Sequence, residues 1–84
     1  MTTFRPYAKH DPDADAIYVV LLDADVTRSH TLDDFRIIDY SDDRRVVGVE
    51  FLGVGGGIDL QDIPHREKVE KAIHELNLGI KIFA

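Results

Sequence analysis

Hydrophobic and polar residues follow one another in short runs along the first two thirds of the chain, a pattern typical of strands. The run 16–22 (AIYVVLL) is wholly apolar, is flanked by turn-forming residues and is too short for a buried helix, so it predicts a central strand. Such a strand indicates a sheet that is covered on both faces. Residues 3–9 predict a strand at a sheet edge, because Pro6 donates no ladder hydrogen bond. Residues 26–32 alternate and predict a strand near the other edge.

Residues 35–40 and 46–52 predict the clearest hairpin. If Ser41 pairs with Arg45, the connection is a three-residue loop in which Arg44 takes a left-handed conformation. This register sets opposite charges against each other, whereas a slip by one residue mixes the two faces. The predicted pairs are Phe35 with Phe51, Ile37 with Val49 and Asp39 with Val47 on one face, and Arg36 with Glu50, Ile38 with Gly48 and Tyr40 with Val46 on the other.

The last third of the chain predicts a glycine-rich connection over 53–62 and a helix over 63–78. Pro64 suits the first helical turn, and Gly79 suits the left-handed residue that follows a helix. The tail 79–84 alternates and fits either a terminal edge strand or an extension of the apolar seam. One apolar stripe defines the buried side of the helix: Val69, Ala72, Ile73 and Leu76.

These segments predict an α+β fold in a single domain, residues 1–84. An antiparallel meander of four to five strands, residues 1–52, carries the C-terminal helix on one face. A single helix covers only part of such a sheet, so the opposite face is expected to be an apolar patch of the kind that marks association. The residues expected there are Ile38, Tyr40, Val46 and Leu52. We therefore expect a homo-oligomer, with a dimer as the first candidate, formed by sheet stacking or edge pairing.

Three segments of this sequence carry a family resemblance: 10–19 (HDPDADAIYV), 38–40 (IDY) and 46–52 (VVGVEFL). Together they resemble the domain-of-unknown-function family numbered 2283, small bacterial and archaeal proteins that open with Tyr-Asp-Pro-x-x-Asp-x-x-Tyr. The resemblance covers about residues 7–53. It implies a compact antiparallel sheet and no established activity, and the toxin-like neighbours of some members imply an antitoxin-like role. The chain departs from the pattern at His10, Ala24 and Arg44.

Composition narrows the function classes. The 84 residues include no cysteine, which excludes disulfides, thiolate zinc sites and cysteine nucleophiles. No run reaches the roughly 18 apolar residues that a membrane span needs. Residues 1–10 contain no signal-peptide core, so we expect a cytoplasmic protein without membrane association. A chain this short also has a thin stability margin, which favours a second copy.

Charge indicates the kind of partner. Sixteen acidic residues against ten basic ones give a formal net charge of −6, and a phosphate backbone repels such a chain at long range. We therefore expect no nucleic-acid partner, whereas a basic protein partner is favoured.

The candidate site is a set of six polar residues: Asp11, Asp13, Asp15, Tyr18, Asp39 and Glu50. The first three imitate the start of an EF-hand loop, but Ala16 and Leu22 stand where that loop needs Gly and Glu. Turn chemistry, and hydrogen bonds that the Asp15 carboxylate accepts from backbone amides, explain them better. The four histidines lack zinc-site spacing, and neither serine sits on a nucleophile elbow. We expect no catalytic residue, metal ligand or cofactor, and no enzyme activity.

Asp39 is the hardest of these residues to explain, because an unpaired carboxylate on an apolar face is costly. Its carboxylate either accepts hydrogen bonds from backbone amides of the turn over 42–45, or it forms a polar cluster with Tyr18 or with the turn over 11–15. In the second case the cluster specifies a partner. The leading function is a protein-interaction module, either self-assembling or an acidic antitoxin-like partner of a basic protein. The alternative is a small-ligand or metal-binding protein whose site forms at a subunit interface from the same acidic residues and the histidines.

Overall fold

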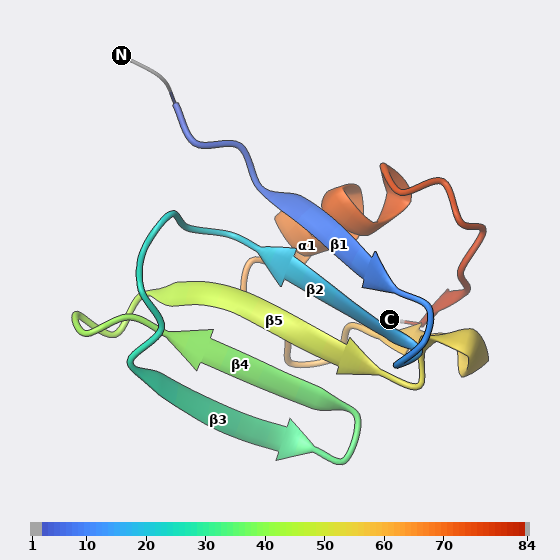
Figure 1. Ribbon diagram of the computed structural model, residues 1–84, viewed down its shortest axis with the longest axis horizontal. Coiled ribbons are helices and arrows are strands. Elements are labelled where there is room, and N and C mark those ends of the chain that lie inside the picture. The colour runs from blue at the N-terminus through green and yellow to red at the C-terminus, as the bar shows by residue number, and fades with distance from the viewer. Residues whose placement is uncertain (1–2, 84) are drawn as a thin grey trace.

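The computed structural model describes residues 3–83 and confirms the α+β fold with an antiparallel meander. Its sheet has five antiparallel strands in the order β1-β2-β5-β4-β3, with the helix α1 beside it (Figure 1). The elements are β1 (Tyr7–Asp11), β2 (Ala16–Val20), β3 (Arg28–Asp33), β4 (Arg36–Tyr40), β5 (Val46–Leu52) and α1 (Arg66–His74). Over residues 3–83, no helix is long and apolar enough to cross a membrane.

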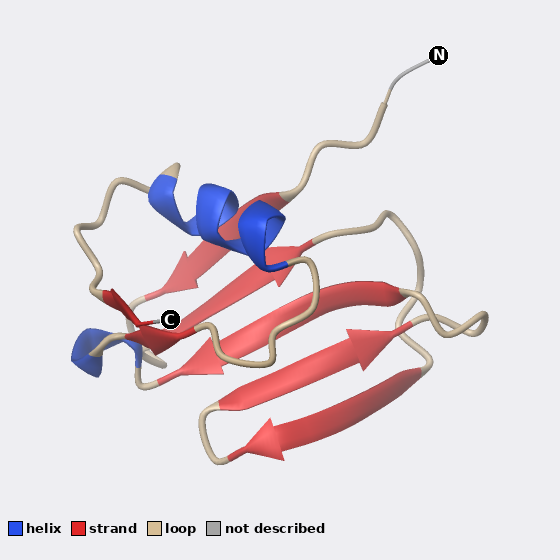
Figure 2. Ribbon diagram, turned by 180° about the vertical axis from the view of Figure 1, so that it is seen from behind, coloured by secondary structure: helices blue, strands red, loops and turns tan. Residues whose placement is uncertain are grey.

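A second layer lies on one side of the sheet. A short 3₁₀ turn, Val54–Gly56, leads to β6 (Ile58–Asp59), and β6 pairs in parallel with β7 (Ile82–Phe83). Figure 2 shows α1 and this strand pair on the same face of the sheet. The predicted terminal strand over 79–84 therefore exists in part, but it pairs with β6 rather than with an edge of the meander. Met1, Thr2 and Ala84, which the predicted segments included, lie outside the described residues.

The hydrophobic core fills the space between these two layers. Phe51 is 1% exposed, and Ile17, Val19 and Val49 are fully enclosed. Burial of each such side chain contributes about 1.5 to 3 kcal/mol. The sheet contributes Ile17, Val19, Ile38, Val49 and Phe51, and the second layer contributes Val54, Ile58, Leu60, Ile63, Val69, Ala72 and Ile73.

The central position in the sheet belongs to β5, and β2 lies next to it. The prediction of covering layers on both faces is wrong. Ile17 and Val19 of β2 are enclosed under the second layer, whereas Tyr18 and Val20 on the other face are only half-buried. The apolar run of β2 is explained by one buried face and one half-exposed face.

The turn of the β4–β5 hairpin is as predicted. Ser41 N donates to the carbonyl of Arg45 at 2.9 Å, Arg44 N donates to the carbonyl of Ser41 at 3.0 Å, and Arg44 has φ 67°. The predicted pair of Tyr40 with Val46 is also confirmed. Beyond it the predicted register is wrong, because a β-bulge between the Tyr40–Val46 and Asp39–Gly48 pairs leaves Val47 without a partner on β4. The observed pairs are Tyr40 with Val46, Asp39 with Gly48, Ile38 with Val49, Ile37 with Glu50 and Arg36 with Phe51.

This bulge changes the composition of both faces. Ile38 is 4% exposed and belongs to the core, and Tyr40 and Val46 pack against the core as well. The expected apolar patch of Ile38, Tyr40, Val46 and Leu52 is therefore wrong in three of its four members. Leu52 alone lies on the uncovered face, in register with Ala16.

The helix is shorter than the predicted span 63–78, because left-handed residues flank it. His65, with φ 53°, precedes the first helical residue, and Asn77, with φ 56°, follows the last turn. A positive φ cannot continue a right-handed helix. Gly79 is left-handed as predicted, but the helix has ended before it. The stripe is confirmed within α1, where Val69, Ala72 and Ile73 are buried.

Candidate functional site

The face of the sheet that points away from α1 is the main candidate for function, and we call it the open face. None of the elements described between residues 3 and 83 lies over it, and Figure 1 looks directly onto it. Alternation along the paired strands places its side chains. They are Tyr7 and Lys9 of β1, Ala16, Tyr18 and Val20 of β2, Gly48, Glu50 and Leu52 of β5, Ile37 and Asp39 of β4, and Ser29 and Thr31 of β3.

A hydrogen-bonded cluster occupies the middle of the open face. The hydroxyl of Tyr18 donates to Oδ2 of Asp39 at 2.9 Å, and the hydroxyl of Ser29 donates to Oδ1 of the same carboxylate at 2.6 Å. Both oxygens of Asp39 are thereby satisfied by side chains from two other strands. The carboxylate can remain half-buried because its desolvation is offset by these bonds.

Gly48 makes this contact possible. It pairs with Val20 on one side and with Asp39 on the other, so it lies directly beneath the path from Tyr18 to Asp39. A Cβ at this position would come within 2.6 Å of both Cζ of Tyr18 and the carbonyl oxygen of Val19. The glycine therefore provides the space in which the phenol ring lies across β5.

The environment of Tyr18 fixes its protonation state. Burial raises the pKa of the phenol first, and the hydrogen bond and negative charge of Asp39 and the nearby charge of Glu50 raise it further. The phenol therefore stays protonated and acts as a donor, which makes it unsuited to accept a proton as a general base.

The structure brings together half of the six candidate residues. Tyr18 hydrogen-bonds Asp39 and pairs across the strands with Glu50. The proposal that Asp39 accepts amides of the turn over 42–45 is wrong, because Ser41 serves that turn: its hydroxyl accepts from Arg45 N at 3.2 Å.

The other three candidates lie in the β1–β2 turn, and two of them have the structural roles that turn chemistry predicts. Asp11 accepts from the amides of Asp13 at 3.1 Å and Ala14 at 3.2 Å. Asp15, with φ 51°, accepts from Gly55 N at 3.0 Å and so ties the turn to the 3₁₀ segment. Asp13 is exposed. Over the described part of the chain, no group of three or more His, Asp or Glu side chains is placed to hold a metal ion.

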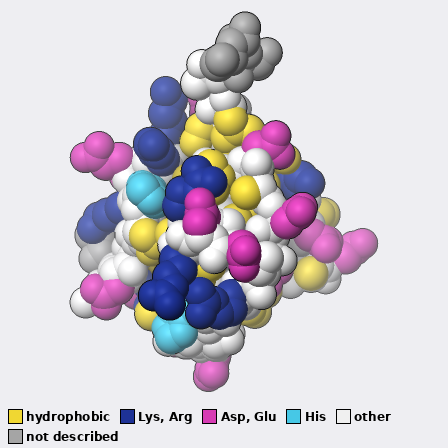
Figure 3. Space-filling model, turned by 90° about the vertical axis from the view of Figure 1, so that its left-hand side faces the viewer, with side chains coloured by type: hydrophobic (Ala, Val, Ile, Leu, Met, Phe, Trp, Pro, Cys, Tyr) yellow, Lys and Arg dark blue, Asp and Glu magenta, His cyan; other side chains and the backbone are white. Residues whose placement is uncertain are grey.

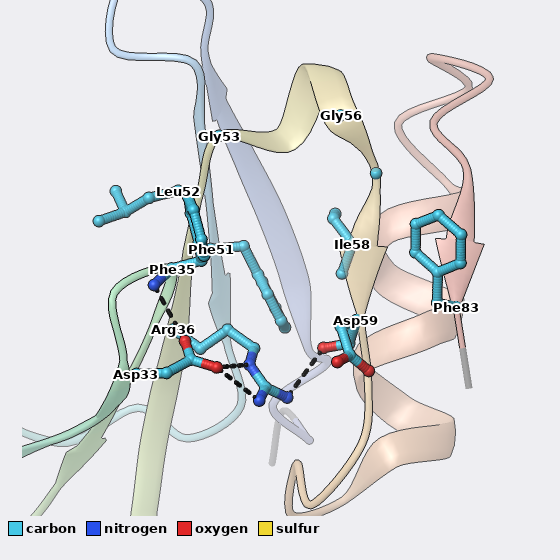
Figure 4. A pocket seen from close by; sticks show the side chains of 11 residues that line it. Asp33, Phe35, Arg36, Phe51, Leu52, Gly53, Gly56, Ile58, Asp59 and Phe83 are labelled. Atoms are coloured by element: carbon cyan, nitrogen blue, oxygen red, sulfur yellow. Dashed lines mark hydrogen bonds and ion pairs between the residues drawn. The ribbon is translucent and has the colours of Figure 1, made fainter.

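A second feature is a cavity of about 340 Å³ at the end of β5, between the sheet and β6 (Figure 4). Its walls are mainly aromatic and aliphatic, with Phe51 buried, Phe35 61% exposed and Phe83 43% exposed. The lining also includes Leu52, Ile58, Asp59, Asp33, Arg36 and the glycines 53, 56 and 57.

Arg36 forms the polar side of this cavity. Its Nε and Nη2 donate to Oδ2 of Asp33 at 3.0 and 2.7 Å, and its Nη1 donates to the carbonyl oxygen of Asp59 at 3.2 Å and to that of Gln61 (Figure 4 draws the bonds to Asp33 and Asp59). The hydrogen bonds from Arg36 and from Phe35 N lower the pKa of Asp33, and Asp33 raises the pKa of Arg36. The guanidinium therefore clamps the 59–61 segment to the sheet instead of offering its charge to a ligand.

The role of Arg36 differs from the predicted pair with Glu50, since Arg36 lies opposite Phe51. The spacing of Asp33 and Arg36 on either side of a tight turn was the available signal, since a carboxylate three residues before an arginine can fold back onto it. The long-range carbonyl partners have no sequence signal.

Comparison with known proteins gives one match. A family model described as "Protein of unknown function (DUF2283)" matches residues 8–54, more than half of the chain. The matched segment contains Tyr18, Asp39, Gly48 and Glu50, whereas α1 lies outside it. No curated protein and no solved structure matches the chain.

Proposed function

The chain belongs to the family of proteins of unknown function DUF2283, and from this premise we propose that it is a protein-interaction module that forms a homodimer by stacking the open faces of two copies. The observation that carries the proposal is the open face itself. Val20, Ile37 and Leu52 are half-buried there without any element above them, and Tyr7 is 42% exposed beside them. These apolar side chains share the face with the polar cluster, and apolar side chains that stay accessible on an uncovered sheet face are typical of association surfaces.

The charges of the open face are compatible with two-fold stacking. Asp39 is satisfied within the chain by Tyr18 and Ser29. Lys9 and Glu50 flank Tyr18 in one cross-strand row and have opposite charges. In a two-fold interface the same patch meets itself, so Lys9 of each copy can approach Glu50 of the other.

The size of the chain supports the same proposal. An 84-residue domain buries a smaller fraction of its surface than a large one, and this sequence contains no cysteine that could form a stabilising disulfide. Covering the open face adds apolar burial that the lone helix does not supply.

The test is light scattering coupled to size exclusion at tens of micromolar protein. We expect a dimer for the natural sequence and a monomer for Ile37→Glu, which places a charge in the middle of the open face. Val26→Glu is the matched control, since Val26 is 47% exposed in the loop before β3, away from the open face, and should leave the dimer intact. Circular dichroism checks that both variants are folded. A monomeric natural protein would contradict the proposal.

An antitoxin-like role is a further candidate for the same module. The net charge of −6 supports a basic protein as the partner, because long-range attraction speeds the encounter of oppositely charged proteins. The test is co-expression with the product of the adjacent reading frame, followed by purification through a tag on one partner. Recovery of a stable complex at physiological salt supports this role, and independent elution of the two proteins counts against it.

A small-ligand role is the alternative from a different class. The cavity of about 340 Å³ between β5 and β6, with Phe35 and Phe83 at its sides, favours an apolar or aromatic ligand over a metal ion. A thermal-shift series with divalent metals and common metabolites separates this alternative from the interaction module, because a ligand that binds only the native state raises its melting temperature.

A further inference from the structure

Two hollows meet at the end of the sheet opposite the cavity described above, and we call them together the basic groove. The first, of about 430 Å³, has an apolar floor of Leu21, Leu22 and Val46. The second, of about 530 Å³, runs past Tyr40 to the edge strand β3. Arg44 lines both, so the two hollows lie side by side at this residue. The remaining basic or histidine side chains of the groove are Arg28, Arg45, Lys68, His30 and His65.

The charge of the groove is opposite to that of the chain. The chain has a formal net charge of −6 and ten lysine and arginine residues in all, of which Arg28, Arg44, Arg45 and Lys68 line this one surface. Figure 3 shows this side of the molecule, where Lys, Arg and His side chains lie around exposed hydrophobic atoms, with Asp and Glu side chains among and beside them. An acidic chain that concentrates its bases in one concave region has a local field that attracts anionic groups.

Most of these cations are free to meet a partner. Asp43 holds Arg45 at 2.7 Å, so Arg45 is already paired. Among the residues that the structure describes, Arg28, Arg44 and Lys68 have no carboxylate at ion-pair distance. Side chains without an internal partner can form ion pairs on binding without first breaking one.

The backbone places these three cations from three different elements. Arg28 begins β3, Lys68 lies in the first turn of α1, and Arg44 is held in the hairpin loop by the bonds between Ser41 and Arg45. Arg44 keeps a positive φ of 67° at this point, a conformation that a glycine would adopt with less strain. The convergence of three charges therefore belongs to the fold and does not need to be assembled on binding.

We propose that the basic groove binds an extended acidic peptide segment of another protein, with aliphatic side chains of that segment on Leu21, Leu22 and Val46. The arginine and lysine side chains of the groove favour acidic residues in the peptide. The apolar floor favours aliphatic residues between those acidic ones. The groove is two joined hollows beside an edge strand, a shape that suits an extended segment better than a compact small molecule. Ser29 lines the groove and also belongs to the open face. The apolar floor and Lys68 lie outside the open face, so the proposed peptide site does not require the homodimer.

The experiment measures binding of a short fluorescein-labelled peptide of alternating Glu and Leu by fluorescence anisotropy. The expected results are affinity that falls with salt and ¹⁵N–¹H shift changes at Leu21, Leu22 and Val46. Lys68→Glu should weaken binding by about tenfold, because it replaces an attraction with a repulsion. Lys71→Glu is the matched control, since Lys71 is exposed on the same helix but outside the groove, and should bind as the natural protein does.

Three results would overturn the proposal. One is equal binding by Lys68→Glu and Lys71→Glu, and another is a preference for a peptide of alternating Lys and Leu. The third is saturation of the groove by single-stranded DNA or inorganic phosphate without binding of the acidic peptide. Because size exclusion reports the homodimer separately, failure of either proposal is recognised without the other.

Discussion

Tyr18 and Asp39 lie on strands separated by β5, yet the hydroxyl of Tyr18 donates a hydrogen bond of 2.9 Å to Oδ2 of Asp39 across Gly48. The bond joins side chains across the surface of β5, not residues paired on adjacent strands. It exists because Gly48, the residue between them, lacks a Cβ. Three residues from three neighbouring strands thus depend on one another.

Tyr18→Phe should lower the free energy of unfolding by about 1 kcal/mol, since it removes one hydrogen bond and leaves Asp39 with its bond from Ser29. Urea unfolding measures the change. Tyr7→Phe is the control, because Tyr7 is 42% exposed on the same face and its hydroxyl has no hydrogen-bond partner within residues 3–83. Equal effects of the two variants would show that the bond to Asp39 contributes nothing.

Gly48→Ala should cost about 2 kcal/mol or more, because the new methyl group meets both the ring of Tyr18 and the backbone carbonyl of Val19 at 2.6 Å. The ring can rotate away, but the carbonyl is held in the sheet. Gly56→Ala is the matched control, since a Cβ there has nothing within 4 Å. Thermal unfolding of both variants gives the comparison, and a harmless Gly48→Ala would refute the close approach.

Arg36→Met should destabilise the protein by about 2 to 3 kcal/mol, because it leaves the carbonyls of Asp59 and Gln61 without their charged donor. Hydrogen exchange should accelerate locally in the 58–61 segment. Arg45→Met is the control, since the Arg45–Asp43 pair is exposed and exposed pairs contribute less than about 1 kcal/mol.

The same site makes stability depend on acid pH. The pKa of Asp33 is lowered by its bonds from Arg36 and Phe35 N, so its contribution is present above the unfolded value of 3.8 and is lost as the pH falls through the folded value. Urea midpoints measured at falling pH should therefore drop less in Asp33→Asn than in the natural protein. Parallel curves for the two proteins would contradict the pKa direction.

Arg44→Gly should raise the free energy of unfolding by about 1 kcal/mol, because glycine adopts a φ of 67° without the strain that a Cβ causes. Arg44→Ala keeps the strain and should give no such gain. Chemical denaturation of both variants separates relief of strain from loss of the arginine charge. A gain in both would assign the effect to charge.

Short-range patterns predicted much of this fold. The strand β5 has the predicted bounds 46–52, and the turn residues around Arg44 predicted its left-handed conformation, because loop length and turn geometry are local properties. The bulge at Val47 is different. The carbonyl of Val47 accepts from the amides of Leu21 and Leu22, which are remote in sequence, and a register matched pair by pair from the turn has no means of placing the bulge.

The same bulge determines which parts of the candidate site could be predicted from the sequence. Asp39 and Tyr18 were proposed as partners because a carboxylate on an apolar face needs a donor, and the structure places them in contact. The predicted register paired Gly48 with Ile38 instead of Asp39, and so placed Asp39 and Gly48 on opposite faces of the sheet. The basic groove has no sequence signal, since its cations come from a strand, a loop and a helix that are far apart along the chain.

The pairing of β6 with β7 has a consequence for biosynthesis. Ile58 N donates to the carbonyl of Lys81 at 2.8 Å, and Leu60 N donates to the carbonyl of Phe83 at 3.0 Å. Residues 81–83 leave the ribosome only after the meander and α1 have been translated. Until residues 81–83 emerge, β6 lacks its strand partner, and the amides of Ile58 and Leu60 lack their acceptors.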